Sequence, residues 1–154
     1  MIWSGLFLCF LLAAAWQDFR NRQVDVCIFV VFGTAAVVSG AVQWLILGEN
    51  YSVPGHMAGS ALGGVLLVAA MASRGGIGTG DGCFFLVSGL MLGFWENLAL
   101  LCYSTLCCGL FCLGYFVWCR TQKGVNIGKR TVPFLPFAVL PGIWLVFCRM
   151  TGAI

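Results

Sequence analysis

The sequence carries two aspartates whose surroundings suit hydrolytic chemistry. Asp18 follows the apolar run 2–17, and Asp81 lies just before the apolar run 83–95. An ionised carboxylate beside hydrocarbon is costly, so residues of this kind are candidates for function. If both runs are membrane helices of opposite direction, the two carboxylates lie at one depth on one membrane face. We therefore expect Asp18 and Asp81 to meet.

Two carboxylates held close together can hydrolyse a peptide bond. They share one proton, because two like charges in a poorly hydrated site cannot both ionise. The ionised member takes a proton from the attacking water, and the protonated member donates to the carbonyl oxygen and later helps to protonate the amine. Since the pair titrates as a unit, the sequence assigns neither role to either aspartate. Carboxylates and water suffice, so we expect no cofactor; a hard metal ion between them is the alternative.

Glycines surround the second aspartate in Gly78-Thr79-Gly80-Asp81-Gly82. Glycine adopts backbone angles that are closed to other residues, and it leaves room for another backbone to approach. We expect Gly78 and Gly80 to shape a loop beside which an extended substrate binds. A loop at membrane depth is tolerated where it lines a protein-walled or watery cavity.

Composition places the whole chain in a membrane. Of 154 residues, 61% are hydrophobic and 8% are charged, whereas a soluble domain carries about a quarter charged residues. The sequence predicts an all-α integral membrane protein with a single domain over 1–154, no soluble appendage, and membrane lipids around it. No basic run is interleaved with aromatic residues, so we expect no nucleic-acid partner.

The distribution of polar residues predicts the topology. Apolar segments at 2–17, 26–46, 56–72, 83–95, 98–118 and 133–150 indicate about six transmembrane helices, with a polar break at Glu96–Asn97 among the connections. With the N-terminus outside, seven of the eight basic residues fall on inner loops; these are Arg20, Arg22, Arg74, Arg120, Lys123, Lys129 and Arg130. Tryptophans mark both ends of the segments. We expect a multi-pass protein of the plasma (inner) membrane with both termini outside and both aspartates facing the cytoplasm.

Two further patterns have a structural and a functional interpretation. Seven of the nine cysteines lie inside apolar runs without a C-x-x-C pair, which favours small packing residues over zinc ligands or disulfides. Gly55, Gly59 and Gly63 recur at a spacing of four, a pattern that lets helices approach closely in lipid. It predicts packing within the chain, and a homo-oligomer face is the alternative.

At these residues a family resemblance appears. Gly78-Thr79-Gly80-Asp81 matches the G-x-G-D motif of the type IV prepilin peptidases and the related archaeal preflagellin peptidases. The segment from Asp18 to Val24 resembles the D-x-R-x-x-x-[IV] motif of that family, with Arg20 as its arginine. Pro133-Phe134-Leu135-Pro136-Phe137 is similar to the proline-bracketed entry to its last helix. The likeness spans nearly the whole chain in the same order.

The resemblance implies an aspartic endopeptidase of the GxGD type that cleaves prepilin-like leaders after a glycine, at the cytoplasmic membrane face. By position, Asp18 and Asp81 would be its catalytic pair. The cytosolic loop with paired C-x-x-C motifs, found in members that also methylate pilins, is absent, so we expect peptidase activity alone. Two positions depart from the pattern: Cys83 stands where lysine is usual, and Asp25 begins the pair that is usually proline-asparagine.

Other interpretations of the same residues stay open at this level. Asp18 would be a simple interfacial residue if it paired with Arg20 or Arg22, and Asp25 suits a helix cap better than a third catalytic acid. A small transporter with proton or cation sites, or an inactive pilus or secretion subunit, is the competing function. A presenilin-like protease acting within the bilayer is a third. His56 falls at the outer end, away from both aspartates.

Overall fold

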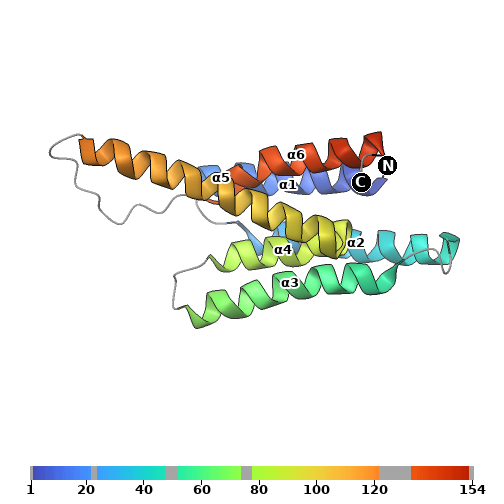
Figure 1. Ribbon diagram of the computed structural model, residues 1–154. Coiled ribbons are helices and arrows are strands. Elements are labelled where there is room, and N and C mark those ends of the chain that lie inside the picture. The colour runs from blue at the N-terminus through green and yellow to red at the C-terminus, as the bar shows by residue number, and fades with distance from the viewer. Residues whose placement is uncertain (1, 22–23, 48–51, 74–77, 122–132, 153–154) are drawn as a thin grey trace.

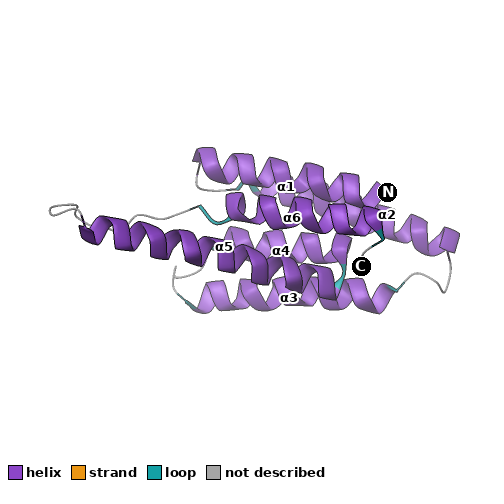
Figure 2. Ribbon diagram, turned by 45° about the horizontal axis from the view of Figure 1, so that its top comes forward, coloured by secondary structure: helices purple, strands orange, loops and turns teal. Residues whose placement is uncertain are grey.

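The computed structural model describes residues 2–21, 24–47, 52–73, 78–121 and 133–152, and all regular structure in these ranges is helical (Figures 1 and 2). The helices are α1 (Ile2–Asn21), α2 (Val26–Leu47), α3 (Val53–Ala72), α4 (Thr79–Leu92), α5 (Phe94–Thr121) and α6 (Leu135–Thr151). The predicted all-α fold with six helices is confirmed. Arg22, Arg74, Lys123, Lys129 and Arg130, which entered the topology prediction, lie outside the described residues.

Helix α4 forms the centre of the bundle. It packs against α1, α2, α3 and α5, while α6 packs against α1 and α5. Most of its side chains are buried, and Phe84 stacks on Phe10 of α1 with ring centroids 5.1 Å apart. The short α4 is therefore positioned from several sides, and with it the aspartate in its first turn.

Glycines allow α3 and α4 to pack most closely of all. A Cβ atom on Gly59 would lie 2.7 Å from the carbonyl oxygen of Gly89, and one on Gly63 would collide with the backbone of Phe85 and Leu86. Such approaches exclude any side chain at these positions. The spacing of four thus serves packing within the chain at Gly59 and Gly63. A Cβ atom on Gly64, by contrast, would meet nothing within 4 Å.

The helix boundary near residue 96 differs from the prediction. Glu96 and Asn97 lie in the first turn of α5, and the chain turns instead at Gly93, whose φ is +89°. Asn97 is fully buried. Its amide nitrogen donates to the carbonyl oxygens of Gly59 (3.0 Å) and Phe85 (2.9 Å), and its amide oxygen accepts from the Ser88 hydroxyl (2.7 Å). An apparent loop signal is therefore a polar contact that joins α3, α4 and α5.

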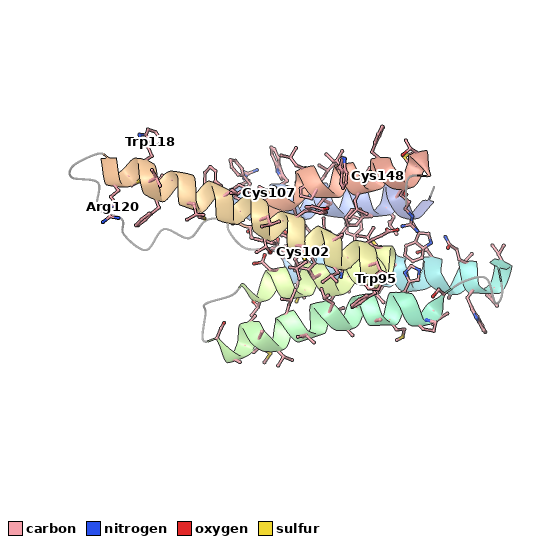
Figure 3. The ribbon with its side chains drawn as sticks, in the orientation of Figure 1. Trp95, Cys102, Cys107, Trp118, Arg120 and Cys148 are labelled. Atoms are coloured by element: carbon pink, nitrogen blue, oxygen red, sulfur yellow. The ribbon has the colours of Figure 1, made fainter. Side chains whose placement is uncertain are left out.

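The outer surface of the bundle is apolar. Helices α2, α3 and α5 each contain a stretch long and apolar enough to cross a membrane. Large hydrophobic side chains of α2, including Val30, Val38 and Leu45, are exposed. Figure 3 shows Trp95 and Trp118 near opposite ends of α5, as expected of residues at two interfaces. This is an all-α membrane protein, and its exposed apolar side chains are suited to contact with lipid.

Candidate active site

The end of α1 carries Asp18 to the start of the last helix. The backbone N–H of Leu135, the first residue of α6, donates a hydrogen bond to Asp18 Oδ2 at 3.1 Å. The amide of Phe134 also acts on this carboxylate. Asp18 is half-buried, and within the described residues it forms no ion pair, with Arg20 or any other base. The simple interfacial pairing with Arg20 is therefore absent, and Asp18 faces the bundle.

Asp81 reaches the same region from the first turn of α4. It is half-buried, and it is near enough to Asp18 for the charge of that residue to act on it. The two aspartates, separated by 63 positions in the chain, thus lie together at one end of the bundle. Cys108 of α5 is near enough for the charge of Asp81 to act on its thiol.

The surroundings perturb both carboxyl groups, which lie beyond the apolar stretches 2–17 and 83–95. Burial raises the pKa of Asp81 to about 6, and the charge of Asp18 acts in the same direction. Burial also raises the pKa of Asp18, but the amides of Leu135 and Phe134 oppose that effect by donating to its ionised form. The site therefore favours a proton on one carboxyl, and the two groups differ in their hydrogen bonds.

The structural role of the glycines before Asp81 differs from the predicted one. Gly78 has ordinary extended angles (φ −68°, ψ 127°), and Gly80 lies inside α4 without a positive φ. The prediction of unusual backbone angles at Gly78 and Gly80 is therefore wrong. A Cβ atom on Gly78 would lie 3.0 Å from Asp81 Oδ2, so this glycine makes room for the carboxylate. Among the described residues, a Cβ atom on Gly80 would meet nothing within 4 Å.

Two other polar residues near this end, Asp25 and Arg20, are exposed. Asp25, just before α2, accepts a hydrogen bond from the Gln17 side chain, and its backbone N–H donates to Gln17 Oε1 at 2.9 Å. It is exposed, as expected of a solvated residue and not of a third catalytic acid. Arg20 is exposed at the end of α1. In the described part of the chain, no group of three His, Cys, Asp or Glu side chains is placed to hold a metal ion.

A second polar cluster lies at the opposite end of the bundle. His56 stacks on Trp3 with ring centroids 5.6 Å apart, and Arg149 pairs with Glu96 at 3.2 Å. These residues come from the starts of α1, α3 and α5 and from the end of α6. His56 is therefore remote from the aspartates, as the sequence predicted.

Sequence reasoning missed the backbone amide that contacts Asp18. The proline-bracketed segment before α6 was the available signal, because Pro136 fixes the start of a helix whose first amides need acceptors. Nothing in the pattern identified a side chain 117 positions earlier as the acceptor.

A family model described as the type IV leader peptidase family matches residues 5–113, which include both aspartates. No curated protein and no solved structure shows a significant match to the chain.

Proposed function

The chain belongs to the type IV leader peptidase family, and on that premise we propose that it is a membrane-embedded aspartic endopeptidase with Asp18 and Asp81 as its catalytic pair. The observation that carries this proposal is that both carboxylates lie at one end of the bundle, close enough for the charge of one to act on the other. One water between them would attack the scissile carbonyl while the protonated carboxyl donates to its oxygen.

The substrate in this proposal is a prepilin-like protein, cut after the glycine that ends its leader. Gly80 supports it, because no described residue lies within 4 Å of a Cβ atom placed there, and such space would suit a substrate backbone beside Asp81. Arg20, exposed beside the same end, is proposed to shape this region or contact the substrate. The site would face the cytoplasm, since that orientation places most basic residues on inner loops.

The test is co-expression with a candidate prepilin, in which leader removal is followed by gel shift and mass spectrometry. We compare the wild type with Asp18→Ala and Asp81→Ala at matched membrane levels. Asp25→Asn is the matched control, because it removes an exposed carboxylate at the same end whose described partner is Gln17. We expect cleavage after the leader glycine by the wild type and the control, and at least a thousandfold loss in both alanine variants.

Each other outcome has a definite meaning. Normal cleavage by either alanine variant would show that the catalytic assignment is wrong. Failure of the wild type to cut any prepilin leader would favour the inactive subunit or the transporter.

A further inference from the structure

The strongest asymmetry in the candidate site is the contact between Asp18 and the last helix. Leu135 is the first residue of α6, and its N–H belongs to the first turn, where amides have no acceptor within the helix. It donates to Asp18 Oδ2 at 3.1 Å. The next residue, Pro136, has no N–H of its own. The positive end of the α6 dipole is therefore directed at this carboxylate through Leu135 and Phe134.

Among the described residues, Asp81 has no equivalent donor. Its own backbone N–H bonds to the carbonyl oxygen of Gly78 at 3.2 Å. Among the described residues, no hydrogen bond reaches its side-chain carboxylate, and Gly78 contributes only the space beside it. One member of the pair is thus held by amides that prefer a negative charge, and the other is buried without them.

We propose that the N-terminus of α6, acting through the Leu135 N–H, is a positioning element that keeps Asp18 as the ionised member of the pair and leaves the shared proton on Asp81. The inference rests on the peptidase function proposed above. Leu135 itself lies outside residues 5–113, so the family match does not include this contact.

The assignment gives each aspartate one role. Asp18 takes a proton from water, and the water oxygen bonds to the carbonyl carbon while the carbonyl oxygen takes the proton of Asp81. The C–N bond then breaks, and the leaving nitrogen receives the proton held by Asp18. A hydroxyl proton of the intermediate returns to Asp81, which restores the starting state and leaves one acid and one amine.

Within the described part of the chain, few charged groups surround Asp18. Asp81 faces it from α4, the amides of Leu135 and Phe134 from α6, and Cys108 of α5 faces Asp81. On the α1 side, Gln17 is occupied by Asp25. In the described ranges, no basic side chain is paired with either aspartate, so the α6 amides are the groups that distinguish them.

The first experiment needs no cleavage. The chain has three aspartates, so Asp25→Asn with Asp81→Asn leaves Asp18 alone, and Asp18→Asn with Asp25→Asn leaves Asp81 alone. The two proteins are labelled with ¹³C-aspartate, and the side-chain carboxyl resonance is titrated in lipid. We expect Asp18 to ionise at lower pH than Asp81. The reverse order, or equal midpoints, would overturn the inference.

The second experiment removes the donor. Leu135→Pro deletes the N–H at the first helical position, where proline is tolerated, and Leu135→Ala is its control, because both lose the buried leucine side chain. In the protein whose single aspartate is Asp18, we expect the proline variant to titrate about one pH unit higher than the alanine variant. Equal midpoints would show that the amide does not hold the charge.

Leader cleavage supplies the functional measurement. With all aspartates present, the acid limb of kcat/KM should move to higher pH in Leu135→Pro and stay in place in Leu135→Ala. If the wild type cleaves no leader, the proposed function fails, while the ¹³C titration still decides the α6 inference. If cleavage is normal but the acid limbs of the two variants coincide, the inference fails and the peptidase stands.

Discussion

Single residues set the proton balance of the proposed site. Asp18 accepts from backbone amides, whereas Asp81 is buried and feels the charge of its partner. Gly78 lies against the Asp81 carboxylate, and no described residue lies within 4 Å of a Cβ atom placed on Gly80. These contacts lead to two predictions on activity.

The first prediction concerns pH. The competent pair holds one proton, and with a pKa of about 6 Asp81 loses it as the pH rises through that value. We therefore expect kcat/KM for leader cleavage to fall about tenfold per unit above about pH 6. Initial rates from about pH 4 to about pH 8, with folding verified at each pH, provide the measurement. A rate that keeps rising across this range would contradict a protonated Asp81.

The second prediction compares two neighbouring glycines. In Gly78→Ala the new methyl group presses on Asp81 Oδ2, so we expect cleavage to fall about tenfold with little change in KM. In Gly80→Ala the methyl group meets none of the described residues, so we expect any loss to appear in KM, where the substrate binds. Full kinetic curves separate the two effects. An unchanged kcat in Gly78→Ala would show that the carboxylate shifts without consequence.

The sequence patterns predicted which acidic residues form the candidate site, but not the groups that surround them. Asp18 and Asp81 stand beside apolar runs, so their meeting at one end follows from alternating helices. The Leu135 contact depends on how α1 and α6 pack, which no local pattern encodes. For Gly78 the pattern singled out the right residue but predicted unusual backbone angles. The structure instead requires a glycine there because the Asp81 side chain, three residues later, occupies the space that a Cβ atom would need.

At the scale of helices, the α3–α4 contact depends on glycines on both sides. Gly63 lies against the α4 backbone, whereas Gly64 is open. We expect Gly63→Ala to lower the free energy of unfolding by about 2 kcal/mol, since overpacking forces the helices apart. Gly64→Ala should leave it unchanged or raise it by up to about 1 kcal/mol, because alanine favours a helix.

Reversible unfolding in detergent micelles measures both glycine variants. Equal destabilisation by the two substitutions would indicate a general loss of flexibility and not a specific helix contact.

Helix boundaries show where the apolar pattern is least informative. Segments 26–46 and 98–118 agree closely with α2 and the middle of α5. The predicted break at 96–97 is displaced, because buried Asn97 satisfies the carbonyls of neighbouring helices and so acts as a core residue. A polar residue in a membrane sequence indicates a loop only when no partner across a helix contact exists, and partners are a property of the packed structure.

At the scale of the whole molecule, the prediction concerns how the chain is oriented in the membrane. Successive helices run in opposite directions, and α1 begins at the same end at which α6 finishes (Figure 1). With most basic residues on inner loops, we expect both termini outside and the aspartates inside. A reporter enzyme that is active only outside the membrane should work at either terminus, and a fluorescent protein that folds only inside should stay dark. The opposite result at both termini would invert the membrane face proposed for cleavage.

The hydrogen bond between Asp18 and Leu135 also bears on biosynthesis. Its two partners are 117 residues apart and join α1 to α6. During synthesis, once α1 to α5 are in the membrane, both carboxylates are present, but the Leu135 amide that is proposed to distinguish them is not. Proteolytic competence would then arise only when α6 enters the bilayer, so a chain that stops before α6 would carry both aspartates without the charge state proposed for cleavage.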